Sequence, residues 1–105
     1  MKMIRAIVRP EKVEEIVNSL EKEGFNALTK INVFGRGKQK GIQIGQTRYD
    51  ELPKVLLMLV VDDVDCENVI STIQKNARTG GFGDGKIFVT EVEKAYTIRT
   101  GKEGV

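Results

Sequence analysis

The stretch Lys54 to Val61, KVLLMLVV, predicts a β-strand that is apolar on both of its faces. Side chains alternate between the two faces of a strand. One face then carries Val55, Leu57, Leu59 and Val61, and the other carries Leu56, Met58 and Val60. One layer of helices covers only one face of a sheet, and burial of each such side chain contributes roughly 1.5 to 3 kcal/mol. We therefore expect an oligomer in which the second faces of the sheets meet.

The segment before this strand predicts a strand, a helix and another strand. Met3 to Val8 is rich in β-branched residues, and Pro10 after it suits the first turn of a helix. From Glu11 onward, apolar residues recur at helical spacing until Gly24 supplies a stop. These residues are Val13, Ile16, Val17 and Leu20. Ala27 to Phe34 then alternates as a second strand of modest amphipathicity.

The segment after the apolar strand repeats the same order. Any of Asp62, Asp63 and Asp65 could cap a second helix. Its apolar stripe consists of Val69, Ile70, Ile73 and Ala77. Ile87 to Ile98 has the composition of a further strand. With right-handed crossovers, the order predicts an α+β, ferredoxin-like βαββαβ fold, with two helices on one face of an antiparallel sheet. At 105 residues the chain is expected to form one domain, residues 1–105.

Composition limits the classes of function. Hydrophobic residues make up 40% of the chain, and no apolar run approaches the roughly 18 to 20 residues of a membrane span. The N-terminus lacks the pattern of a secretory signal, so a soluble, cytoplasmic protein is expected. A net charge of +2 does not demand nucleic acid as a partner. Cys66 is the only cysteine and histidine is absent, which excludes intrachain disulfides, multi-thiolate zinc sites and histidine-based catalysis.

The stretch TGGFGDGKIF, Thr79 to Phe88, contains the spacing of a phosphate-binding P-loop. A P-loop continues with Ser or Thr and a helix, whereas Lys86 is followed by strand-forming residues. The stretch therefore fails as a Walker sequence. Its glycines can still present backbone N–H groups to an anion, with Lys86 as a point charge. These glycines are Gly80, Gly81, Gly83 and Gly85. From spacing alone, a flexible turn between helix and strand has similar weight.

A second glycine-rich segment favours the anion-binding interpretation. Gly35 to Glu51 contains four glycines and no sustained period, and it is longer than the roughly 12 to 15 residues beyond which structureless loops are usually functional or disordered. Its first part, Gly35 to Gly41, combines three glycines with three cations, which suits contact with an anion. Taken by itself, this part is also consistent with a solvated, flexible loop.

Over essentially its whole length the chain resembles the PII signal-transduction family. The motifs that carry the resemblance are MKMIRAIVRP (1–10), GRGKQKG (35–41), ELPK (51–54), TGGFGDGKIFV (79–89) and TIRTGKE (97–103). Val8 to Lys12, the short loop and Tyr49 to Lys54 further resemble the nitrogenase-associated branch, and within it the first of two paralogues. The resemblance implies a trimer. It also implies a T-loop at residues 35–51, between the second and third strands, a B-loop at 79–86 and a C-terminal loop segment at 97–105.

The resemblance implies MgATP or ADP bound in the clefts between subunits. The implied nucleotide-binding residues are Ile7, Leu28, Thr29, Gly35, Gly37, Lys38, Gln39, Val60, Gly83, Asp84, Gly85, Lys86 and Arg99. Among them, Lys86 would neutralise phosphate charge, and Arg99 would reach the nucleotide of a neighbouring subunit. Ile7, Leu28, Thr29 and Val60 would line the adenine pocket, although the aliphatic ones also suit an ordinary core.

The resemblance also implies 2-oxoglutarate as an effector. The implied contacts are Gly37, Lys38, Gln39, Lys40, Gly41 and Lys54. The Gln39 side-chain oxygen would ligate Mg²⁺ together with ATP and 2-oxoglutarate, since Mg²⁺ prefers oxygen ligands. Lys54 would pair with the distal carboxylate of 2-oxoglutarate. Taken alone, Lys54 is also consistent with a cation that protects a strand edge.

The implied function is regulation rather than catalysis. The protein would bind and inhibit dinitrogenase through the T-loop, and 2-oxoglutarate with MgATP would relieve the inhibition. The implied partners are a second PII-like paralogue and dinitrogenase, and no nucleic acid or membrane insertion is expected. The T-loop residues expected to contact the partner are Arg36, Ile42, Ile44, Arg48 and Tyr49.

Three alternatives stay open at this point. The target could be another protein, such as an ammonium transporter or glutamine synthetase. The chain could be an RNA-binding ferredoxin-like module, although Phe88 lacks the aromatic pattern with which such sheets stack on bases. ATP hydrolysis could occur, and we expect it to be slow and incidental. Uridylylation of Tyr49 is not predicted, because Tyr49 is out of register with the modified tyrosine of relatives.

Overall fold

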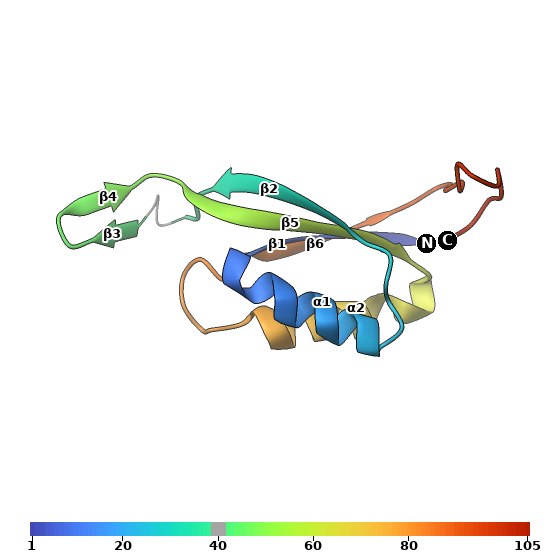
Figure 1. The fold of residues 1–105 in the computed structure, drawn as a ribbon, viewed down its shortest axis with the longest axis horizontal. Helices are drawn as coiled ribbons and strands as arrows, with labels where there is room; N and C mark the ends of the chain where they lie inside the picture. The colour runs from blue at the N-terminus through green and yellow to red at the C-terminus, as the bar shows by residue number, and fades with distance from the viewer. Residues whose placement is uncertain (39–41) are drawn as a thin grey trace.

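The structure, a computed structural model, describes residues 1–38 and 42–105. Its main sheet has four antiparallel strands in the order β2-β5-β1-β6 (Figure 1). The strands are β1 (Lys2–Val8), β2 (Thr29–Gly35), β5 (Leu52–Val61) and β6 (Lys86–Glu91). The helices are α1 (Val13–Lys22) and α2 (Cys66–Ala77), preceded by the 3-10 turns η1 (Pro10–Lys12) and η2 (Asp63–Asp65). The predicted ferredoxin-like βαββαβ order is confirmed.

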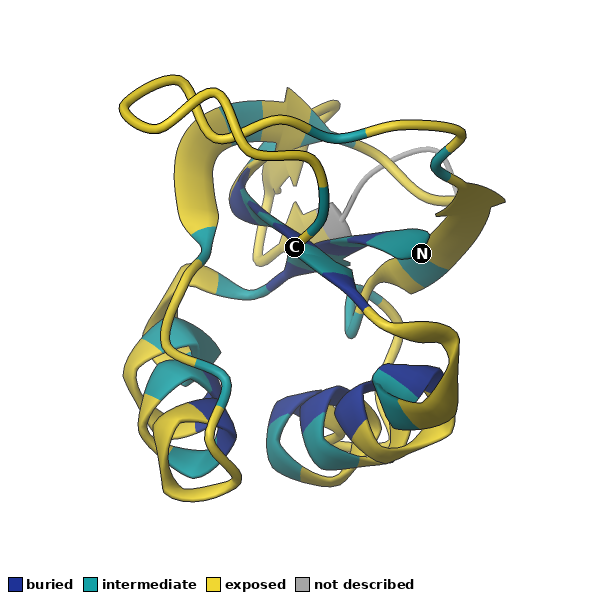
Figure 2. Cartoon of the chain, turned by 90° about the vertical axis from the view of Figure 1, so that its right-hand side faces the viewer, coloured by how far each residue is buried: buried dark blue, intermediate teal, exposed yellow. Residues whose placement is uncertain are grey.

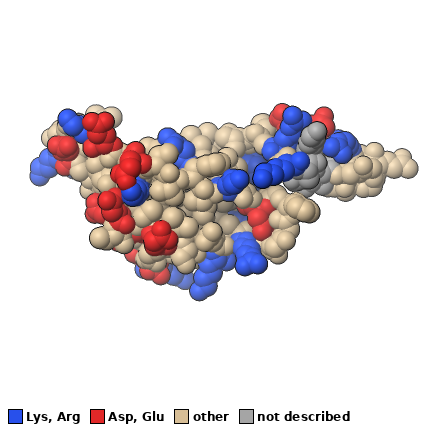
Figure 3. Space-filling model, turned by 180° about the vertical axis from the view of Figure 1, so that it is seen from behind, with Lys and Arg blue, Asp and Glu red and all other residues tan. Residues whose placement is uncertain are grey.

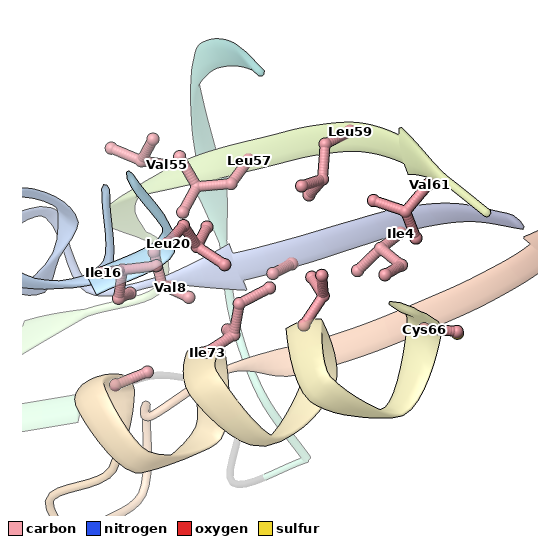
Figure 4. Close-up of a cluster of buried hydrophobic side chains, with 13 residues drawn as sticks. Ile4, Val8, Ile16, Leu20, Val55, Leu57, Leu59, Val61, Cys66 and Ile73 are labelled. Atoms are coloured by element: carbon pink, nitrogen blue, oxygen red, sulfur yellow. The ribbon is translucent and has the colours of Figure 1, made fainter. Parts of the chain in front are cut away.

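Both helices lie on the same face of the sheet and turn their buried residues toward it (Figures 1 and 2). The strands β1 and β5 supply alternate residues to the core between the layers, and the helices supply the opposite side (Figure 4). The fully buried side chains are Ile4, Val8, Ile16, Leu20, Leu57, Val69 and Ile73. No helix in the described part of the chain is long and apolar enough to cross a membrane.

The second face of the sheet is also apolar, as KVLLMLVV predicts. Leu56, Met58 and Val60 of β5 pair with Ile7, Arg5 and Met3 of β1, and all six are only half-buried. Ile31 of β2, opposite Leu56, is 42% exposed. No helix of the described residues covers this face. A surface that buries this face therefore has to come from outside these elements. The predicted oligomer would supply it, and the oligomer stays a prediction.

The strand predicted from Ile87 to Ile98 is too long. β6 ends at Glu91, which pairs with Lys2, the first residue of β1, so the neighbouring strand offers no further partners. Beyond it the chain turns back on itself between Tyr96 and Glu103, which form an isolated bridge. The tip of this turn is closed by bonds from Gly101 N–H to the Thr97 carbonyl at 2.7 Å and from Thr97 N–H to the Lys102 carbonyl at 2.9 Å.

The helix starts also differ from expectation. Each helix is entered through a 3-10 turn, and no aspartate makes a side-chain capping bond to the start of α2. Asp63 instead lies 3.0 Å from the N-terminal ammonium group. The hydrogen bond to that ammonium and its charge lower the pKa of Asp63.

The long loop contains a hairpin that the sequence analysis did not predict. β3 (Ile42–Ile44) and β4 (Thr47–Tyr49) pair antiparallel around a two-residue turn in which Gly45 has φ +61°. Left-handed backbone at such a turn matches the twist of a hairpin and favours glycine. Three residues a side are too few to produce a convincing period in the sequence. The hairpin projects beyond the end of the main sheet (Figure 1).

Leu57→Ala should lower the free energy of unfolding by about 2 to 5 kcal/mol, because Leu57 is fully buried and its truncation leaves a cavity. Chemical denaturation followed by circular dichroism measures the change. Glu14→Ala on the exposed face of α1 is the control and should stay within about 0.5 kcal/mol of the wild type. An equal effect of both substitutions would contradict the assignment of Leu57 to the core.

Candidate functional site

The site lies at the end of the sheet where the long loop leaves the body of the protein. β1 and β2 end here and β5 and β6 begin here, so segments far apart in the sequence come together (Figure 1). We call residues 79–86 the glycine loop. Between it and the base of the long loop is a cavity of about 700 Å³, the loop cavity. Figure 3 shows Lys and Arg side chains gathered where the projecting hairpin joins the body.

The loop cavity brings together most of the predicted ligand-binding residues that the structure describes. Ile7 comes from β1 and Lys54 from β5. Gly35 is the last residue of β2, and the segment just after it supplies further residues. The others come from the glycine loop and β6. The predicted residues that line it are Ile7, Gly35, Gly37, Lys38, Lys54, Gly83, Gly85 and Lys86. Arg36, predicted as a partner contact, lines it too, and so do Leu52, Phe82 and Phe88.

The remaining predicted adenine-pocket residues do not line this cavity. Leu28 packs against the hydrophobic core, which was the alternative interpretation of that residue. Val60 lies opposite Met3, four residues along β1 from Ile7, so the two are separated by about 13 Å of strand. Thr29 lies opposite Met58. One chain therefore does not assemble Ile7, Thr29 and Val60 into a single pocket.

Arg99 lies at the opposite end of the molecule from the glycine loop. It is carried on the C-terminal turn, drawn in red in Figure 1. The predicted contact of Arg99 with nucleotide therefore requires a neighbouring copy. Gln39, Lys40 and Gly41, the predicted ligands of Mg²⁺ and 2-oxoglutarate, lie outside the described residues.

Asp84 was expected to face phosphate, but its carboxylate is bound by its own loop. It accepts bonds from the Thr79 hydroxyl at 2.5 Å and from the backbone N–H groups of Thr79 and Gly80 at 2.9 Å each. These bonds, led by that from the Thr79 side chain, hold the pKa of Asp84 far below its ordinary value. Gly81 N–H donates to the Thr79 hydroxyl at 3.1 Å. The N–H groups of Gly80 and Gly81, considered for anion binding, are thus already used.

Two cations attach the glycine loop to the sheet. Arg9 Nε lies 3.1 Å from Asp84 Oδ1, and Arg9 Nη2 donates to the Phe82 carbonyl at 2.9 Å. Lys54 Nζ donates to the Gly83 carbonyl. Lys54 is only 8% exposed, and this burial, followed by the charge of Arg9, lowers its pKa. The sequence analysis did not identify Arg9, although it follows Ile7 at the strand's period of two.

Two successive backbone groups of the loop are left for a ligand. Phe82 and Gly83 form a turn after Gly81, and none of the described residues accepts a hydrogen bond from the N–H groups of these two residues. Successive free N–H groups in a glycine-rich turn form an anion-binding concavity. Lys38, Lys54 and Lys86 line the cavity beside them, so this arrangement fits a phosphate chain.

Comparisons with known proteins identify the family of the chain. The family Nitrogen regulatory protein P-II matches residues 1–102. "Nitrogen fixation nifHD region glnB-like protein 1" of Methanococcus maripaludis is 65% identical over 100 residues, 95% of each chain. The protein of the same description from Methanothermobacter marburgensis is 57% identical over the full length of both chains, 105 residues. "Nitrogen regulatory protein P-II 2" of Methanothermobacter thermautotrophicus is 47% identical over 108 aligned positions, covering 99% of this chain and 94% of that one.

The chain belongs to the PII family of nitrogen regulatory proteins. The predicted resemblance to the nitrogenase-associated branch is confirmed by the relatives of the nifHD region, whose descriptions also carry the number of the first paralogue.

Gly85→Ala should destabilise the protein far more than Gly80→Ala. Both residues have positive φ, +103° and +92°, so both substitutions incur backbone strain of about 1 to 3 kcal/mol. A Cβ at Gly85 would also lie 1.7 Å from the Ile7 carbonyl oxygen, whereas a Cβ at Gly80 meets nothing within 4 Å. Thermal and urea denaturation of the two variants measure the difference. Equal destabilisation would contradict the close approach of β6 to β1.

Proposed function

We propose that the chain regulates nitrogen fixation by sensing ATP or ADP and 2-oxoglutarate at the loop cavity. Membership in a family of regulators supports a role without catalytic turnover. The descriptions of relatives from nifHD regions support nitrogen fixation as the regulated process. The observation that carries the nucleotide site is the pair of successive unpaired N–H groups, at Phe82 and Gly83, beside a cavity lined by lysines.

The phosphates would bind at the glycine loop. Its free N–H groups donate to phosphate oxygens, and Lys86 and Lys38 compensate their charge. Glycine at positions 83 and 85 lets the ligand approach the backbone closely. Mg²⁺ would be held by the Gln39 side-chain oxygen and would neutralise the phosphate charge. Ile7 lies at the wall of the cavity and offers an apolar surface to the nucleotide.

The effector would act on Lys54. In the absence of ligand its ammonium group donates to the Gly83 carbonyl and is largely buried. A carboxylate of 2-oxoglutarate is a stronger acceptor for this ammonium group than a neutral carbonyl, because the two opposite charges attract each other. Backbone groups of Gly37, Lys38, Lys40 and Gly41 would hold the other end of the molecule. Binding of the effector would then couple the glycine loop to the long loop.

The long loop would carry the signal to dinitrogenase. Its hairpin projects from the body and exposes Ile44 (63%) and Tyr49 (44%), two apolar side chains that a partner surface can bury. Arg48 lies on the same hairpin, with its Nε 3.7 Å from Asp50. We propose that the loop inhibits dinitrogenase when 2-oxoglutarate is low. Bound MgATP and 2-oxoglutarate would favour a second loop state through about 1 to 3 kcal/mol of coupling.

Assembly into a trimer would complete the site. The half-buried apolar face of the sheet supports burial against further copies. Such packing would bring Arg99, Thr29 and Val60 of one subunit toward the glycine loop of another. A mixed assembly with the second paralogue would use the same face.

Titration calorimetry of 2-oxoglutarate into the purified protein tests the sensor. Binding should require MgATP and should be lost in Gln39→Ala, which removes the Mg²⁺ ligand, and in Lys54→Met, which removes the carboxylate partner. Lys94→Met, an exposed lysine outside the cavity, is the matched control and should bind as the wild type does. An inhibition assay on dinitrogenase with and without both ligands then tests the target.

ATP binding without a response to 2-oxoglutarate would assign metabolite sensing to another protein. Ligand-controlled binding to an ammonium transporter or glutamine synthetase in place of dinitrogenase would assign a different target. Absence of binding by both ATP and ADP would overturn the proposed site.

Met58→Asp should break the oligomer, since it places a charge in the middle of the apolar sheet face. Size-exclusion chromatography with light scattering should give three times 11.7 kDa, about 35 kDa, for the wild type and a smaller mass for the variant. Lys30→Asp, at an exposed position on the helix-bearing side of β2, should leave the mass unchanged. A wild-type mass of one chain would contradict the assembly.

A further inference from the structure

Arg9 makes two separate contacts to the glycine loop from the end of β1. Its Nε is 3.1 Å from the Asp84 carboxylate, and its Nη2 donates to the Phe82 carbonyl at 2.9 Å. The side chains of Arg9 and Asp84 are 22% and 25% exposed, so the pair is largely shielded from water. A planar guanidinium that donates in two directions fixes the orientation of what it binds, which a single ammonium group cannot do.

Asp84 connects Arg9 to the rest of the loop. Its Oδ1 accepts hydrogen bonds from Arg9 Nε and from the Thr79 hydroxyl. Its Oδ2 accepts hydrogen bonds from the backbone N–H groups of Thr79 and Gly80. The carboxylate thus joins the residues that follow α2 to the end of β1. Loss of Arg9 would remove one of the contacts to Asp84 and, among the described residues, the only hydrogen bond to the Phe82 carbonyl.

The same pair sets the charge of the site. Asp84 places a carboxylate one residue from the free N–H groups to which phosphate would bind. Arg9 neutralises that charge, and its positive charge is also felt by Lys54, whose Nζ donates to the next carbonyl, that of Gly83. Without Arg9, an uncompensated carboxylate would stand beside the phosphates and repel them.

We propose that Arg9 is a positioning residue of the nucleotide site, which acts through Asp84 and the Phe82 carbonyl to hold the glycine loop in its anion-binding conformation. This inference rests on the proposed nucleotide binding. Arg9 itself need not contact the ligand. Its effect on affinity is transmitted by the loop, which distinguishes it from Lys86 and Lys38.

A double-mutant cycle tests this inference with ADP and ATP as titrants in calorimetry. The proteins are the wild type, Arg9→Gln, Asp84→Asn and the double variant. Arg9→Gln should weaken the binding of both nucleotides on the order of 10-fold to 100-fold, because hydrogen bonds between charged groups are lost. The double variant should bind no more weakly than Arg9→Gln alone, because the carboxylate that Arg9 compensates is gone. Arg9→Lys should recover only part of the affinity.

Arg78→Gln is the matched control. It removes an arginine that ends α2 just before the same loop and whose side chain makes no hydrogen bond or ion pair to the described residues of the loop. This variant should leave the affinity within about 2-fold of the wild type. Circular dichroism and thermal melting confirm that each variant is folded. If Arg9→Gln is unfolded, Arg9→Lys and Asp84→Asn still test the coupling, because Arg9→Lys should lose affinity only when Asp84 is present.

The outcomes separate the two proposals. A wild type that binds neither nucleotide would overturn the proposed site and this inference with it. Nucleotide binding that is unchanged in folded Arg9→Gln would overturn the role of Arg9 alone. Strictly additive losses in the double variant would also overturn it, because they would mean that Arg9 and Asp84 act on the ligand independently.

Discussion

The close approach of the glycine loop to the end of β1 is the constraint on which the site depends. At Gly85 the backbone passes so near the Ile7 carbonyl that no side chain fits. This contact lets β6 enter the sheet at Lys86 opposite Ile7 and brings the glycine loop over the same edge. The contact fixes the register of β6, and through it the position of Lys86 beside the cavity. The sheet and the candidate site therefore both depend on the backbone contact between Gly85 and Ile7.

Given that contact, electrostatics shapes the loop. Two cations from neighbouring strands, Arg9 and Lys54, hold three consecutive loop residues by one carboxylate and two carbonyl groups. The carboxylate of Asp84 is directed to donors within the protein, so the negative charge of the loop is compensated before a ligand arrives. The backbone N–H groups that remain unpaired are the ones suited to an anion. This arrangement suits the binding of an anion.

A single chain brings together only some of the predicted ligand-binding residues. The loop cavity collects those of the glycine loop and of the base of the long loop, while Thr29, Val60 and Arg99 lie elsewhere on the same molecule. The apolar second face of the sheet gives a physical reason for association, because its side chains gain most when they leave water. Under the proposed function, assembly and ligand binding would then depend on each other.

The sequence by itself determined the fold, and it identified several residues that meet at the loop cavity. Alternation in KVLLMLVV, helical spacing in the two stripes and the order of elements predicted the sheet with its two helices, because these patterns are local. The motifs that carry the family resemblance placed Lys54, Gly83, Gly85 and Lys86 at one site, and the loop cavity contains all four. The end of β6 and the short hairpin were missed, because one depends on where the neighbouring strand begins and the other has only three residues a side.

Only the tertiary structure decided which polar groups satisfy one another. Arg9 and Asp84 are 75 residues apart in the chain, and nothing in the local sequence pairs them. The pairing makes the Asp84 carboxylate part of the loop's internal support, and its contact with nucleotide stays a prediction. Likewise, the burial of Lys54 against Gly83 follows from the approach of the glycine loop to β5. Such contacts depend on how distant segments meet in space, whereas periodicity reports only what each segment does along its own length.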